Sequence, residues 1–100
     1  MSTADPYRFQ YETVAASQTN QVLGGTGAVG DYVERLIVTV NTAATSTVSL
    51  IDNATTVMTV PANTPIGVYS IEVNAASASG SWRVTTGAGA TVLAVGIFSA

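Results

Sequence analysis

The chain has 100 residues, with three basic and six acidic side chains and with no His and no Cys. This length fits one domain. Without His or Cys the chain cannot form a Ser-His-Asp triad, a Cys nucleophile, a disulfide or a zinc site of the usual ligands. The three basic side chains are all Arg, and the net charge is −3. So few cations neutralise few phosphates, and nucleic-acid binding is therefore not expected.

The composition favours strands and a surface with little charge. Charged residues make up 9% of the chain, against about 25% in an average soluble domain. Ala and Thr occur 15 times each and Val 14 times, and the branched Cβ of Thr and Val suits a pleated surface. A free monomer normally stays soluble through interspersed charges. We therefore expect copies or partners to cover much of this surface, the alternative being a soluble Thr-rich β domain.

The first element of the chain is predicted to be an extended arm or a first strand within residues 1–16. Tyr7, Phe9 and Tyr11 alternate with polar side chains, which is the period of a strand. Aromatic and Arg side chains are also enriched at the energetic centres of interfaces. Two interpretations stay open here, an arm docked on a partner and the first strand of the core sheet. The candidate partner-binding residues are Tyr7, Arg8, Phe9 and Tyr11.

Residues 17–100 are predicted to form a single β-sandwich domain. Alternating or continuous apolar segments recur at a spacing of about 8–12 residues and are separated by Gly, Pro, Asn and Ser, which is typical of an antiparallel sandwich. With the first segment they give about seven or eight strands and no convincing helix, in an all-β, jelly-roll-like fold. Trp82 is expected in the core, and the apolar final strand is expected to be covered on both faces. The further strands are predicted at 21–23, 32–41, 45–51, 55–60, 66–74, 81–86 and 91–99.

A glycine-rich segment matches the G-x-G-x-x-G pattern of dinucleotide-binding proteins. Residues 25–30 read GTGAVG. In dinucleotide-binding folds these glycines open a helix whose N-terminus holds the pyrophosphate. Here Val33, Ile37 and Val38 follow with the period of a strand. The segment is therefore interpreted as a structural loop, and no cofactor is predicted.

The acidic residues do not form a recognisable catalytic or metal-binding pattern. Asp31 and Glu34 are close in sequence, but a glycosidase needs two carboxylates that face each other across a cleft. Calcium at Asp31 or Asp52 would need a loop of spaced oxygen ligands, which the sequence lacks. These carboxylates are expected to be solvated in loops or paired with Arg35 or Arg83. No catalytic or metal-binding residue is predicted.

The ends of the chain carry no targeting pattern. The first six residues lack the basic and apolar regions of a signal peptide. No apolar run approaches the roughly 18 residues of a membrane-spanning helix. Synthesis in a cytoplasm and no membrane association are therefore expected.

Two stretches carry a resemblance to a known class of proteins. They are VLGGTGAVGDYVERLIV at residues 22–38 and SGSWRVTTGAGATVLAVG at residues 79–96. Together they resemble small β-rich virion proteins of tailed bacteriophages, of the capsid decoration or cement type. The resemblance covers roughly residues 21–98 and implies a small sandwich or jelly roll that forms homotrimers on the capsid exterior. It implies a partner, the major capsid protein, and no catalytic residues.

The expected function is therefore that of a structural virion protein that bridges neighbouring coat subunits and so stabilises the capsid. The alternative is a head-fibre or tail-appendage module that binds a host surface glycan. That alternative predicts exposed aromatic side chains at the loop end of the domain, near Tyr32 or Trp82.

Overall fold

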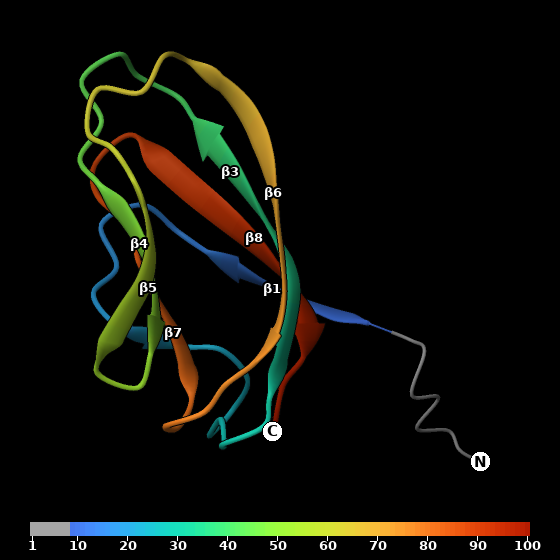
Figure 1. Cartoon of the computed structure of the whole chain (residues 1–100). Coiled ribbons are helices and arrows are strands. Elements are labelled where there is room, and N and C mark those ends of the chain that lie inside the picture. Colours follow the sequence, from blue (N-terminus) through green and yellow to red (C-terminus); the bar gives the residue numbers. More distant parts are fainter. Residues whose placement is uncertain (1–8) are drawn as a thin grey trace.

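The computed structural model describes residues 9–100, which form eight strands in two four-stranded antiparallel sheets and no helix (Figure 1). The first sheet contains, in spatial order, β1 (Gln10–Val14), β8 (Ala90–Ile97), β3 (Tyr32–Val40) and β6 (Gly67–Ala76). The second contains β2 (Gln21–Val22), β7 (Trp82–Thr85), β4 (Val48–Asp52) and β5 (Thr55–Val60).

The strand pairing is nested. β4 pairs with β5, β3 with β6, β2 with β7 and β1 with β8, so that one long hairpin is wrapped into two sheets. Two sheets of four strands with this connectivity form a jelly roll. The all-β, jelly-roll-like sandwich expected from the sequence is confirmed.

Alternating apolar side chains fill the space between the two sheets. Leu36 and Val38 of β3 are fully buried, as is Leu50 of β4 on the facing sheet. Burying one such side chain contributes roughly 1.5–3 kcal/mol. Alternation along these strands thus places one face of each strand in the core. The buried apolar residues are Val14, Leu23, Val33, Leu36, Val38, Val40, Val48, Leu50, Trp82, Val84, Ala90, Val92, Ala94 and Phe98.

The final strand differs from its prediction. Val92 and Ala94 of β8 are buried, but Leu93 and Val95 are only half-buried and Ile97 is 39% exposed. β8 is a central strand with backbone pairs to both β1 and β3, yet within residues 9–100 no further layer covers its outer face. The expectation that both faces of this strand are covered was wrong, because its outward apolar residues belong to the surface of the first sheet.

Asp31 connects several segments at one end of the sandwich. Trp82 is buried in the core, as predicted, and its indole Nε1–H donates a hydrogen bond of 2.8 Å to the backbone oxygen of Asp31. The same oxygen accepts the N–H of Ser77 at 2.8 Å. The Asp31 carboxylate accepts the N–H of Ala28 at 3.1 Å, and the N–H and hydroxyl of Ser99 at 2.9 and 2.7 Å. One residue thus fixes four other parts of the chain.

The glycine-rich loop before β3 packs against the last residues of the chain. The N–H groups of Thr26 and Gly27 donate to the Ser99 carbonyl oxygen at 3.3 and 3.2 Å. Gly24 has a φ of +89°, and a Cβ there would overlap that same oxygen. These glycines therefore serve a close backbone approach. The segment that follows is a strand, and the interpretation as a structural loop agrees with this packing.

A second buried carboxylate holds the turn region of the other sheet. Asp52 ends β4, and its carboxylate accepts the N–H of Ala78 at 2.8 Å and that of Ser79 at 3.2 Å. Asn53 follows with a φ of +56°, a conformation that Asn tolerates better than most residues. A tight turn therefore joins β4 to β5, and the Asp52 carboxylate is engaged in structure.

Removal of the Asp31 carboxylate should therefore destabilise the fold. In Asp31→Ala the N–H groups of Ala28 and Ser99 lose a charged acceptor, which we expect to cost about 2–4 kcal/mol. Denaturant unfolding followed by Trp82 fluorescence measures this change. The control is Glu72→Ala at a side chain that is 69% exposed, expected to shift stability by no more than about 0.5 kcal/mol. Equal effects of the two variants would contradict the role assigned to Asp31.

Candidate interaction surface

The outer faces of the two sheets differ in chemistry. The outward side chains of β7, β4 and β5 are mostly hydroxyls, such as Thr85, Ser49 and Thr59. The first sheet instead presents aromatic, aliphatic and a few charged groups. We call its outward surface the β1–β8–β3–β6 face. It consists of Phe9, Tyr11, Thr13, Tyr32, Glu34, Arg35, Ile37, Thr39, Val68, Ser70, Glu72, Asn74, Thr91, Leu93, Val95 and Ile97.

Aromatic side chains are divided between the core and this face. Within residues 9–100, Trp82 and Phe98 are buried and Tyr69 packs against the core. Phe9, Tyr11 and Tyr32 lie on the β1–β8–β3–β6 face. Tyr11 is 72% exposed and Phe9 46%. Their exposure makes them the largest apolar groups that this sheet offers to another molecule.

The start of the described chain is a strand of the sheet. β1 pairs with β8 from Gln10 to Val14, so the interpretation as a first strand holds for this part of the segment. Phe9, just before it, stacks on Tyr32 of β3 with ring centroids 6.1 Å apart and an angle of 14° between the planes, within the range of an offset stack. Of the predicted partner-binding residues, Phe9 and Tyr11 thus share one face. Tyr7 and Arg8 lie outside the described residues.

The register gathers aromatic and aliphatic groups over β1 and β8, and it gathers the charged groups over β3 and β6, where Ile37 and the exposed Val68 also lie. Across the sheet, Tyr11 is opposite Val95, Val95 opposite Arg35, and Arg35 opposite Glu72. One step along, Leu93 lies beside Ile37. The face therefore has an aromatic and aliphatic part over β1 and β8 and a charged, hydrogen-bonded part over β3 and β6. Mixed surfaces of this kind are typical of protein interfaces.

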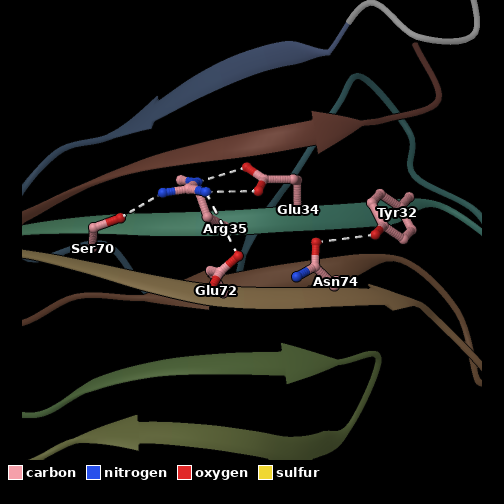
Figure 2. Close-up of polar contacts among 6 residues, drawn as sticks. All are labelled: Tyr32, Glu34, Arg35, Ser70, Glu72 and Asn74. Atoms are coloured by element: carbon pink, nitrogen blue, oxygen red, sulfur yellow. Dashed lines mark hydrogen bonds and ion pairs between the residues drawn. The ribbon is translucent and has the colours of Figure 1, made fainter.

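A bulge in β3 creates the ion pair in the polar part. Neighbouring residues of a regular strand point to opposite faces. The register of β3 shifts between Val33 and Arg35, so Glu34 and Arg35 both point outward. The Arg35 Nε and Nη2 donate to the two Glu34 oxygens at 2.7 and 2.9 Å (Figure 2). This two-bonded pairing lowers the pKa of Glu34 chiefly through the hydrogen bond to Arg35.

Arg35 also reaches across to β6. Its Nη1 donates to the Ser70 hydroxyl at 2.9 Å, while its Nη2 lies 3.8 Å from Glu72. The Tyr32 hydroxyl donates to the side-chain oxygen of Asn74 at 3.2 Å (Figure 2). The predicted pairing with Arg35 is confirmed for Glu34. For Asp31 and Asp52 the expectation of solvation or pairing with Arg was wrong, because both are buried and accept hydrogen bonds from backbone N–H groups. Arg83, the other candidate cation, donates to the Ser81 hydroxyl at 3.1 Å on the opposite sheet.

The acidic residues singled out by the sequence are not assembled into a catalytic pair. Asp31 is bound to Ala28 and Ser99 inside a loop, whereas Glu34 is bound to Arg35 on the outer face. Within the described part of the chain, no group of three or more metal-ligating side chains is close enough to hold an ion. The glycan alternative placed one aromatic platform near Trp82, and this placement was wrong, because the ring is 2% exposed.

Sequence reasoning missed most of the β1–β8–β3–β6 face. It found Phe9 and Tyr11, but it did not place Leu93, Val95 and Ile97 on a surface. The signal available for these residues was their alternation with Val92, Ala94 and Gly96, which are smaller or buried. When a strand is apolar throughout, its sequence does not show which of its Leu and Val side chains point outward and which point inward.

Comparison with protein-family models, with characterised proteins and with solved structures finds no match to this chain. The described residues also contain no helix long and apolar enough to span a membrane. Functional inference therefore depends on the chemistry of the surface.

The Glu34–Arg35 pair gives a test in solution. Because the pKa of Glu34 is lowered in the folded state, its pairing stabilises the protein above the ordinary glutamate pKa, and this contribution is lost as the pH falls through the lowered value. A carbon NMR titration of the Glu34 carboxyl should give a midpoint below the ordinary value. Arg35→Gln should raise that midpoint, whereas Arg83→Gln should leave it unchanged. An unchanged midpoint in Arg35→Gln would show that the pair does not form in solution.

Proposed function

We propose that the protein is a structural virion component that decorates a bacteriophage capsid and bridges neighbouring coat subunits. The observation that carries this proposal is the β1–β8–β3–β6 face, which joins exposed Phe9 and Tyr11 to a row of aliphatic side chains on β8. In this proposal the protein acts through contact area, without a catalytic step. The major capsid protein is the partner, the capsid exterior is the location, and the trimeric state is the one implied by the resemblance.

The size of the face supports a role in binding another protein. The four strands contain 5, 8, 9 and 10 residues. At about 3.4 Å per residue and a strand spacing of about 4.8 Å, they give a surface of roughly 520 Å². A standard interface takes about 800 Å² from each partner. The sheet face alone therefore approaches one side of a standard interface, and flanking loops can supply the rest. With many copies on one particle, modest contacts of this size act together.

The low charge of the face supports the same role. Among residues 9–100 its charged groups are Glu34, Arg35 and Glu72, and two of these pair with each other. Burying few unpaired charges keeps the desolvation cost of docking low. The apolar part supplies aromatic anchors of the kind that dominate binding energies.

The fold agrees with this function and with one alternative. Jelly rolls occur in viral capsid proteins and in lectins, and a fold by itself does not decide a function. Glycan binding remains the second candidate because Tyr11 is 72% exposed and could stack on a sugar ring. A glycan array with the isolated protein separates the two: selective binding that Tyr11→Ala abolishes would favour the glycan module.

The docking role of the β1–β8–β3–β6 face is tested with bacteriophage capsids that lack this protein. Recombinant protein should bind such particles, and Tyr11→Arg should reduce the bound fraction at least tenfold, because a charge replaces an exposed apolar anchor. Val57→Arg is the matched control, since Val57 is 51% exposed on the second sheet. Cosedimentation measures binding, and electron cryomicroscopy shows which face is covered. Equal binding by Tyr11→Arg and wild type would exclude this face as the contact.

Binding should also depend only weakly on salt. Contacts through apolar groups are little screened, whereas contacts between exposed charges weaken steeply with ionic strength. Between 50 and 500 mM NaCl we expect the bound fraction to change by less than about threefold. Release of the protein at moderate salt would indicate an electrostatic contact instead of the apolar one proposed.

A further inference from the structure

Within residues 9–100 the sandwich has four edge strands, β1, β6, β2 and β5. They differ in how readily they can pair with an added strand. β2 has two residues and β1 has five. β5 has six residues, is interrupted by an extra residue at Val57 and is followed by Pro61. β6 has ten residues and contains no Pro, Lys or Arg. Short length, bulges, Pro and charges are the devices that block edge pairing, and β6 has the fewest of them.

The usable part of β6 runs from Gly67 to Val73. Asn74 has a φ of +51°, and the register with β3 shifts beside it, so regular backbone ends there. Within residues 9–100 no strand pairs with the free side of this edge, where alternate residues direct an N–H and a C=O outward. The usable segment has seven residues. This is longer than the mean strand of about five to six residues, and it offers a complete site for an added strand.

An apolar groove lies beside this edge. It has a volume of about 560 Å³ and opens between the edge strands β5 and β6, with Met58, Val60, Tyr69 and Ile71 among its lining residues. These four side chains are only partly buried against the core. The open side of the sandwich therefore exposes apolar surface next to unpaired backbone groups. One bound molecule can cover the apolar surface and also form hydrogen bonds with these backbone groups.

A second copy of the chain, related to the first by a two-fold axis, can pair with the β6 edge and cover the groove. Two antiparallel β6 strands would be related by an axis perpendicular to the sheet, so the two first sheets would join into one of eight strands. The same rotation brings β5 of each copy toward β5 of the other and sets groove against groove. Such a contact is self-complementary, as two-fold interfaces must be.

Charge selects the register. With Ile71 opposite Ile71 of the second copy, each Glu72 lies opposite Ser70 of the other copy, and that Ser70 is bonded to Arg35 at 2.9 Å. Glu72 is 69% exposed, and its contact with Arg35 of the same copy is long, at 3.8 Å (Figure 2). The Glu72 carboxylate can therefore also pair with the guanidinium of the other copy. Sliding the strands by two residues, so that the two-fold axis passes through Glu72, would set the two Glu72 side chains opposite each other, and like charges in that position are destabilising. A slip of one residue is excluded because it would place inward side chains opposite outward ones.

From this edge, groove and charge pattern we propose that the protein forms a homodimer through antiparallel pairing of β6 strands, with Ile71 at the two-fold axis and Glu72 of each copy beside Arg35 of the other. The proposal does not depend on the capsid function. It also differs from the trimer implied by the resemblance, because a three-fold contact cannot pair a strand with itself.

The oligomeric state tests the proposal with a matched pair of charge variants. Sedimentation of the 10.1 kDa chain across micromolar to millimolar concentrations should show a dimer. Ser70→Glu keeps the fold, because the new carboxylate can accept from Arg35, but it faces Glu72 of the second copy and should weaken dimerisation about tenfold. Thr13→Glu adds the same charge to the same sheet on β1, at the opposite edge, and should leave dimerisation unchanged.

Three results would overturn the proposal: a monomer at every concentration, a trimer, or equal weakening by Ser70→Glu and Thr13→Glu. The capsid-binding test on Tyr11 is unaffected by any of them, so failure here is distinct from failure of the proposed function.

Disulfide trapping tests the register, because the natural chain has no Cys. A mixture of Ser70→Cys and Glu72→Cys chains should form a mixed disulfide, since directly opposite residues lie within disulfide reach. Ser70→Cys alone should cross-link far less, because its partner Cys would lie on the diagonal, about 7–8 Å away. Efficient cross-linking of Ser70→Cys with itself and none in the mixture would overturn the register.

Discussion

The hydrogen bonds around Asp31 hold one end of the sandwich together. Its backbone oxygen accepts from the Trp82 indole and from Ser77, and its carboxylate accepts from Ala28 and Ser99. Through these bonds the start of β3, the core Trp and the segment that follows β8 are joined at a single point. In a chain without disulfides, a shared buried acceptor of this kind replaces a covalent link between segments that are far apart in sequence.

The remaining stability comes from a core of small, branched side chains, and this choice has a consequence outside the core. Val and Thr alternate along the strands, so the groups that face outward are hydroxyls and methyls in place of charges. On the second sheet this leaves several hydroxyls, such as Ser49, Thr59 and Thr85, beside Arg83 and the exposed Val57. On the first sheet, Tyr11, Leu93 and Val95 instead form an aromatic and aliphatic surface. The contrast between the two outer faces is the main reason for assigning a binding role to the first.

Local patterns predicted the strands well because each pattern depends on a few neighbouring residues. Periodicity predicted strands such as 32–41 and 55–60, and Trp82 was assigned correctly to the core. The pairing of distant segments was less accessible to sequence. The bulge that turns Glu34 and Arg35 to one face depends on the register among β6, β3 and β8, which no local pattern encodes. The outer face of β8 was misjudged for a related reason, since a continuous apolar strand reads the same whether one or both of its faces are covered.

The nested pairing also determines the order in which strands can pair during synthesis. The β4–β5 hairpin is local, so it can form as soon as both strands have left the ribosome. β1, made first, finds its partner only in β8, made last. Until translation reaches that strand, the early segment with its exposed Tyr11 has no place in a sheet. Contacts this distant in sequence also slow folding. The first strand therefore stays unpaired while the six strands between it and β8 are made, and the surface that joins β1 to β8 forms only after β8 has been translated.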